Sequence, residues 1–171
     1  MPAHLWPLLR LKADSEAELK EKYRQIYIET YVKSALGEEI FIYDWHGVRV
    51  RFHAKTFDHA FSESRDYRFG DGYHDKFSKK RARCILWIKE VLSASRGTIE
   101  CINQMRRDSR NRLRKRRVLI VVEEKYVVVL QATRHNDLEF VTAYPASEGY
   151  IRKIRRDGTV SEIKKPQSYG D

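Results

Sequence analysis

Helical spacing of aromatic and apolar residues characterises the first part of the chain. Tyrosines and isoleucines recur three and four residues apart between positions 15 and 36, which predicts an amphipathic helix. Ser15 and Glu18 have the spacing of a capping box, and Gly37 stands where a helix usually ends. We expect the tyrosine face of this helix to pack against the rest of the protein.

A period of two replaces the helical spacing between residues 39 and 52. Apolar residues alternate with polar ones on both sides of Trp45-His46-Gly47, which predicts a β-hairpin. Thr56 and Ser78 can each cap a further helix, the first through residue 64 and the second through about residue 92. The polar segment 65–75 contains glycine and is predicted to be a loop between them.

Strand-like runs with short polar turns follow Gly97. These runs are 98–102, 118–123, 126–132 and 138–144. Their spacing predicts four strands in an antiparallel meander. A small hairpin is also expected over residues 150–165, because Asp157-Gly158 is a favoured two-residue turn.

The length of 171 residues favours one compact domain, and the order of elements places it in the α+β class. We divide the chain into an N-terminal helical extension, 1–38, and a main unit, 39–171. The main unit begins with the hairpin and two further helices and ends with a four-stranded antiparallel sheet. Within it, 103–116 is expected to be a basic loop, since 106–117 holds eight basic residues and one acid.

The charge balance points to a polyanionic partner. Lys and Arg total 34 against 24 Asp and Glu, so the net charge is +10, and nucleic acid is the expected ligand. Two cysteines, Cys84 and Cys101, are too few for a disulfide scaffold, which favours a reducing cytoplasm. The first eleven residues are too short and too interrupted for a signal peptide or a membrane span, so we expect no membrane partner.

Short blocks between about Val48 and Tyr144 occur in a recognisable order. The blocks are Phe57-Asp58-His59-Ala60-Phe61 with Glu63-Ser64, Arg81-Ala82, Ile85, Trp87-Ile88-Lys89, Arg116-Arg117-Val118, Tyr126-Val127-Val128-Val129 and Phe140-Val141-Thr142-Ala143-Tyr144. This order resembles the phage-associated branch of the barnase, EndoU, colicin and RelE-like ribonuclease superfamily. The first 38 and the last 20 residues lie outside the resemblance.

The resemblance implies helices followed by a four-stranded antiparallel sheet, with RNA cleaved on the open face of that sheet. Members of this superfamily commonly act as toxins in conflict between phages, plasmids and bacteria. An acidic antitoxin or immunity protein would then be a second partner besides RNA. The tract 106–115 is more basic than the pattern of the family, and this departure could change the substrate.

Metal-independent RNA cleavage needs a group that moves a proton and fixed donors for the phosphate. Histidine titrates closest to neutral pH, and His59 is the first candidate, with His53 as a second catalytic candidate. Asp58 and Glu63 lie near enough in sequence to raise the pKa of His59 if either packs against it. The alternative is that His59 only packs or caps a short helix.

Arginine, threonine and tyrosine complete the predicted catalytic set. Arg116 and Arg117 must point to opposite faces of their strand, and we choose Arg117 as the phosphate ligand on the face shared by Thr142 and Tyr144. The plain alternative is that Thr142 and Tyr144 only reflect the preference of such residues for strands. The remaining nucleic-acid-binding candidates come from two basic tracts: Lys79, Lys80, Arg83, Arg110, Arg112, Arg114 and Lys115.

The predicted function is therefore a metal-independent endoribonuclease, toxin-like or phage-derived, without cofactor or metal, acting by attack of a 2′-hydroxyl on the adjacent phosphate. Two alternatives remain. One is a non-catalytic nucleic-acid-binding or inhibitor protein of a mobile element, which needs the same charge but not His59. The other is a metal-dependent nuclease in which Glu123-Glu124-Lys125 combines with Asp71 or Asp75.

Overall fold

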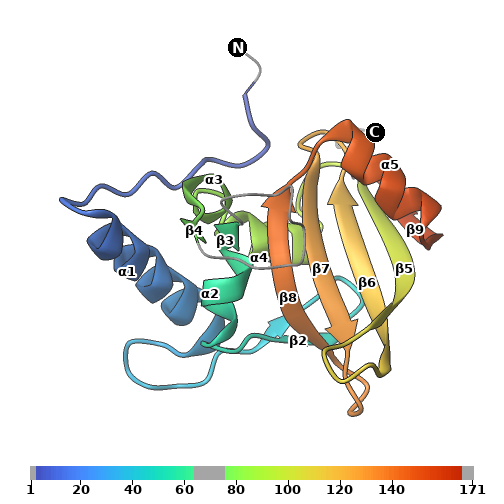
Figure 1. Ribbon diagram of the computed structural model, residues 1–171, viewed down its shortest axis with the longest axis horizontal. Helices are drawn as coiled ribbons and strands as arrows, with labels where there is room; N and C mark the ends of the chain where they lie inside the picture. The colour runs from blue at the N-terminus through green and yellow to red at the C-terminus, as the bar shows by residue number, and fades with distance from the viewer. Residues whose placement is uncertain (1–2, 64–75, 167–171) are drawn as a thin grey trace, which may run out of the picture.

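The computed structural model describes residues 3–63 and 76–166 (Figure 1). The helices are α1 (Glu16–Tyr27), the π-helical turn η1 (Ile28–Val32), α2 (Thr56–Ala60), α3 (Lys79–Ala82), α4 (Trp87–Leu92) and α5 (Glu148–Arg156). The strands are β1 (Ile42–Tyr43), β2 (Arg49–Arg51), β3 (Ser62–Glu63), β4 (Lys76–Phe77), β5 (Ile99–Arg107), β6 (Leu113–Val121), β7 (Tyr126–Ala132), β8 (Leu138–Pro145) and β9 (Thr159–Lys164).

The main sheet has the strand order β1-β2-β8-β7-β6-β5-β9. Strands β5 to β8 form an antiparallel meander, but β2 runs parallel to β8, with Val50 beside Leu138. The structure is therefore α+β, and the predicted four-stranded antiparallel sheet is wrong, because the sheet is mixed and has seven strands. Alternation within a strand reveals the strand, whereas edge pairing between segments almost ninety residues apart leaves no local pattern.

The sheet is strongly curled. Its first hairpin and β9 lie at opposite edges of the strand order, yet their side chains meet. Trp45 Nε1 donates to Glu162 Oε1 at 3.2 Å, and His46 Nε2 lies 2.6 Å from Glu162 Oε2. The turn of the hairpin therefore reaches across one face of the sheet to the far edge.

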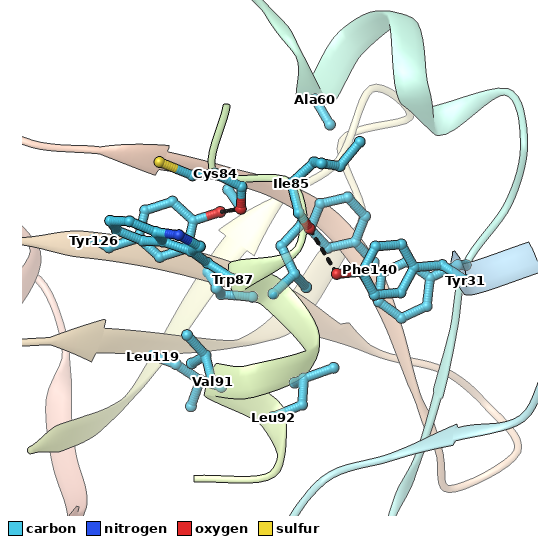
Figure 2. Close-up of a cluster of buried hydrophobic side chains, with 14 of the residues drawn as sticks. Tyr31, Ala60, Cys84, Ile85, Trp87, Val91, Leu92, Leu119, Tyr126 and Phe140 are labelled. Carbon is cyan, nitrogen blue, oxygen red and sulfur yellow. Dashed lines mark hydrogen bonds between the residues drawn. The ribbon is translucent and has the colours of Figure 1, made fainter. Parts of the chain in front are cut away.

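The main core lies on that face of the sheet, beneath α4 and the N-terminal helix (Figure 2). Tyr31 and Tyr126 are buried there, and each hydroxyl donates to a backbone carbonyl, of Ile85 at 2.6 Å and of Cys84 at 3.3 Å. The ring of Tyr31 also stacks on Phe52, with centroids 4.5 Å apart. The tyrosine face of α1 and η1 thus shares one core with the strands.

A smaller apolar cluster covers the opposite face of the sheet. Helix α5 crosses this face (Figure 1), and its Ile151 and Ile154 pack on the valines and isoleucines of β5, β6 and β7. The expected hairpin over 150–165 is therefore wrong. Ser147 caps α5 by accepting from the backbone N–H of Tyr150, Asp157 ends the helix, and β9 then pairs with β5.

Three local predictions also need correction. The helix predicted over 56–64 ends at Ala60, because Ser62 and Glu63 pair with Phe77 and Lys76. The helix predicted from Ser78 to residue 92 is interrupted by turns at 83–86. The carbonyls of Arg83, Cys84 and Ile85 in these turns accept hydrogen bonds from Leu9, Tyr126 and Tyr31, which belong to other segments. The expected loop 103–116 consists of the ends of β5 and β6 and a tight turn, in which Asp108 accepts from the backbone N–H groups of Arg110 and Arg112.

Candidate anion-binding active site

A cavity of about 700 Å³ opens on the face of the sheet that carries α5. Helices α2, α3 and α5 supply its walls, and β5 to β8 supply its floor. Its lining residues are His59, Arg81, Gln104, Arg106, Arg116, Val118, Val129, Thr142, Tyr144, Pro145, Ala146, Ser147, Tyr150 and Ile154. None of these described lining residues is an aspartate or glutamate, whereas three are arginines.

The structure brings together three of the catalytic candidates that the sequence suggested. His59, Thr142 and Tyr144 all line this cavity, although more than eighty residues separate the histidine from the other two. Thr142 and Tyr144 share a face of β8, as the two-residue spacing predicts. His59 lies at the end of α2 and is exposed.

The carbonyl of Ala60 holds the walls of the cavity together. Thr142 Oγ1 on β8 donates to this oxygen at 3.3 Å, and Arg81 Nη1 on α3 donates to it at 3.3 Å. Because Ala60 follows His59 directly, the two bonds fix the end of α2 against both α3 and the sheet. The end of α2, which carries His59, is therefore fixed by contacts with α3 and with β8.

Asp58 is directed to α1. Its carboxylate accepts from Arg24 Nη2 at 2.8 Å, and Lys20 Nζ lies 3.1 Å from it. The hydrogen bond from Arg24 is the main reason why the pKa of Asp58 is lowered. Its charge is thus compensated by α1, and Asp58 is not among the residues that line the cavity with His59.

Arg117 lies on the opposite face of the sheet from Thr142 and Tyr144. Its Nη1 is 3.5 Å from Asp44 Oδ2, and its guanidinium lies over the Trp45 ring, 5.6 Å from the centroid. Asp44 is buried and also accepts from the backbone N–H groups of His46 and Val48, so Arg117 holds the first hairpin against the sheet. The prediction that Arg117 lies on the same face of the sheet as Thr142 is therefore wrong.

Arg116 takes the place that the sequence analysis gave to its neighbour. The register pairs Val118 with Val129 and Val129 with Thr142, so the even-numbered residues of β6 face the cavity. The Nε atom of Arg116 is buried and has no hydrogen-bond partner among the described residues. Burial, and then the nearby charge of Arg106, lower the pKa of Arg116.

Arg81 is a second cavity arginine that the sequence analysis did not select. Ser78 caps α3 by accepting from the backbone N–H of Arg81, which fixes where this short helix begins. The Arg81 guanidinium lies over the ring of Tyr144, 5.0 Å from its centroid, and burial lowers its pKa. Arg81 belongs to the blocks that carry the family resemblance, but the sequence alone does not separate it from Lys79 and Lys80.

Two tyrosines form the wall between β8 and α5. The rings of Tyr144 and Tyr150 meet edge to face, with centroids 5.8 Å apart. Burial, and then a hydrogen bond with Tyr150, raise the pKa of Tyr144 well above the usual value for tyrosine. The Tyr144 hydroxyl therefore stays protonated at neutral pH, so it can donate a hydrogen bond but is a poor base.

The remaining sequence candidates lie outside this cavity. His53 lines the neighbouring cavity, and its Nε2 is 3.6 Å from Glu139 Oε2. Lys79 and Lys80 are exposed on α3, and Arg83 is half-buried beside them. Arg112 and Arg114 line a third cavity, Arg110 is exposed in the turn between β5 and β6, and Lys115 is exposed on the strand face opposite the cavities.

The segment proposed for a metal-dependent nuclease has other contacts. Glu123 accepts from the backbone N–H of Thr98 at 2.8 Å, Glu124 lies 2.7 Å from His4 Nδ1, and Lys125 pairs with Glu148 at 3.2 Å. Within 3–63 and 76–166, no group of three or more His, Cys, Asp or Glu side chains is placed to hold a metal ion. Asp71 and Asp75 lie outside the described residues.

Comparisons with protein-family models, with curated proteins and with solved structures found no match. The resemblance to the ribonuclease superfamily stays a prediction. In the part of the chain that the structure describes, no helix has the length and apolar character needed to cross a membrane.

Proposed function

We propose that the cavity binds an RNA phosphate and that the protein is a metal-independent endoribonuclease. One observation carries this proposal: a histidine, three arginines and hydroxyl side chains line a single cavity whose described lining contains no carboxylate. Arginine supplies fixed, always-charged donors to phosphate oxygens, and histidine exchanges protons near neutral pH. Together these groups meet the needs of phosphoryl transfer to a 2′-hydroxyl.

The electrostatics of the arginines supports an anionic ligand. Burial lowers the pKa of both Arg81 and Arg116. The partial desolvation of these two cations therefore costs free energy in the folded protein. Neither guanidinium loses its charge, because the pKa of arginine remains far above neutral pH. Arg81 already donates to the Ala60 carbonyl and has the Glu63 carboxylate nearby, whereas Arg116 has no ion pair with a described carboxylate, so a bound phosphate would give Arg116 a charged partner.

The proposed reaction forms a bond between the 2′-oxygen and phosphorus and breaks the bond between phosphorus and the 5′-oxygen. His59 accepts the proton of the 2′-hydroxyl and later returns it to solvent, and the leaving 5′-oxygen takes a proton from water. Arg81 and Arg116 balance the charge that develops on the other phosphate oxygens, and the protonated Tyr144 hydroxyl donates to one of them. The products are a 2′,3′-cyclic phosphate and a 5′-hydroxyl.

Thr142 acts by position in this scheme. Its hydroxyl donates to the carbonyl of Ala60 and so holds His59 over the floor of the cavity. A displacement of a catalytic group by about 1 Å can cost about 10²-fold in rate, so such a tether matters for turnover.

The test uses the purified full chain on total RNA, with and without EDTA. We expect cleavage in both conditions and 2′,3′-cyclic phosphate ends on the fragments. Cleavage that disappears in EDTA and returns with magnesium would favour the metal-dependent alternative. Salt-sensitive binding without cleavage of any RNA would favour the non-catalytic binding protein.

We also propose the biological setting that follows from this activity. The enzyme would act in a reducing cytoplasm, where the two buried cysteines remain thiols, and it would be toxic to the cell that makes it. An acidic antitoxin or immunity protein could cover the same arginines. Growth arrest on expression, relieved by His59→Ala, is the expected phenotype.

A further inference from the structure

The active-site cavity continues into two more cavities along the same face of the sheet. The second cavity, of about 550 Å³, shares His59 and Arg116 with the first. The third, of about 590 Å³, shares His53 and Glu139 with the second. The shared lining residues make the three cavities neighbours along the sheet, and we call them together the depression, which leads from α5 to the turns 108–112 and 133–137.

Arginine side chains follow this depression. Arg106 and Arg114 stand directly opposite each other on β5 and β6, and Arg116 lies two residues further along β6 on the same face. Like charges directly opposite across a sheet are destabilising. Neither Arg106 nor Arg114 forms an ion pair with a carboxylate of the described residues, so both guanidinium groups are available to an anionic ligand.

The acids along the depression already have partners. Glu139 accepts from Gln131 Nε2 at 3.3 Å and lies 3.6 Å from His53 Nε2. Asp108 accepts from the backbone and side chain of Arg112 and so shapes the turn. The net charge of the depression stays positive, since Lys55, Arg107 and Arg134 also line it.

The strand geometry divides the basic tract into two sets. Arg114 and Arg116 line the cavities, whereas Lys115 and Arg117 alternate with them and point to the other face. The number of basic residues in the tract therefore overstates its capacity for one ligand. Only the residues on the cavity face can contact a strand that enters the active site.

We infer that the substrate is a single strand of RNA that extends from the active-site cavity along this depression, with its phosphates on Arg116, Arg106, Arg114 and Arg134. The inference rests on the proposed function and names the substrate class of the same site. A cavity of about 700 Å³ matches the size of sites for drug-sized ligands, so it holds one or two nucleotides rather than a stacked duplex. The catalytic groups lie between α2, α3 and α5, where a strand must separate from its complement to enter.

The test compares Arg114→Gln with Lys115→Gln, which are adjacent in sequence and lie on opposite faces of β6. Binding is measured with a labelled 2′-O-methyl oligoribonucleotide of about 16 nucleotides, the upper end of single-strand site sizes. This probe lacks the 2′-hydroxyl and cannot be cleaved, so its binding does not depend on catalysis. The same strand annealed to its complement, and a 2′-O-methyl dinucleotide, are the comparison ligands.

We expect Arg114→Gln to weaken binding of the single strand severalfold and to reduce its salt slope by about 0.7, the value for one lost phosphate contact. Dinucleotide binding should not change, Lys115→Gln should behave as the parent, and the duplex should bind more weakly than the single strand. Circular dichroism and thermal unfolding of both variants check that the fold is retained.

Equal effects of the two substitutions, or a duplex that binds as tightly as the single strand, would overturn the inference that single-stranded RNA binds along the depression. These outcomes leave the proposed enzyme intact if unmodified RNA is still cleaved. Conversely, the expected binding pattern without any cleavage of unmodified RNA would support binding along the depression and overturn the proposal that the protein is an endoribonuclease. If none of the three probes binds, the inference that RNA binds along the depression is wrong.

Discussion

Arg116 and Arg117 are neighbours in the chain, but their side chains lie on opposite faces of the sheet and have different partners. Arg117 meets the buried carboxylate of Asp44 and the ring of Trp45, so its charge is compensated inside the protein. Arg116 faces a cavity whose described lining contains no carboxylate, and its Nε is buried without a partner among the described residues. Arg117 therefore helps to hold the fold, whereas we propose that Arg116 binds an anionic ligand.

The same contrast holds for whole surfaces. The face under α4 buries a large aromatic and aliphatic core in which polar hydroxyls are satisfied by backbone carbonyls. The face under α5 buries a smaller apolar cluster and leaves arginines beside it. We therefore assign stability mainly to the first face and chemistry to the second, and the following predictions test that division.

The largest effect is expected from His59→Ala. Loss of a general acid or base usually costs about 10²- to 10⁴-fold in rate, so turnover should drop by at least about 10²-fold. RNA affinity should stay near that of the parent, since the arginines remain. His4→Ala is the matched control, because His4 pairs with Glu124 and lines none of the three cavities. A His59→Ala variant that cleaves RNA as fast as the parent would exclude the proposed role.

Arg116→Gln is expected to have the next largest effect. It removes a charged donor from the proposed phosphate site, and loss of one such donor costs about 10²-fold in turnover. The free energy of unfolding should not decrease, because the substitution also removes a partly buried cation without a carboxylate partner. Cleavage assays and urea unfolding measure the two quantities, and a stability loss without an activity loss would contradict this role of Arg116.

Arg117→Gln should show the reverse pattern. Its removal leaves the Asp44 carboxylate buried without its cation, which should lower the free energy of unfolding by about 1–3 kcal/mol. Turnover per folded molecule should remain near the parent value, since Arg117 lies on the other face of the sheet. Urea unfolding and cleavage under conditions where the variant is fully folded separate the two effects. Lost turnover in a stable variant would show that the two faces are not independent.

The smallest effect is expected from Asp58→Asn. Arg24 lowers the pKa of Asp58 in the folded state, so the pair contributes stability above the unfolded pKa and loses it as the pH falls through the lower folded value. The carboxylate is more than half exposed, and such a pair stabilises by at most about 1 kcal/mol. The free energy of unfolding of the Asp58→Asn variant should therefore be lower than that of the parent at pH 7 and equal to it at low pH. A shift in the pH profile of cleavage would instead mean that Asp58 tunes His59.

Local patterns in the sequence determined much of this protein. The capping spacing of Ser15 and the helical tyrosines predicted the first helix, although the helix ends at Val32 rather than at residue 36. Alternation predicted the four strands that form the centre of the sheet. The two-residue spacing of Thr142 and Tyr144 was enough to place both on one face of a strand. These features depend on side chains a few residues apart, whose geometry is fixed by the period of the element that carries them.

Only the tertiary structure decided which face is which. Period two separates Arg116 from Arg117, but the register of β6 against β7 and β8 determines which of them meets Thr142. The pairing of β2 with β8, the helix α5 in place of a hairpin, and the convergence of His59 with Arg81 all depend on contacts between distant segments. Such contacts form because burying apolar area on both faces of one sheet outweighs local preference, and a local pattern does not contain that balance.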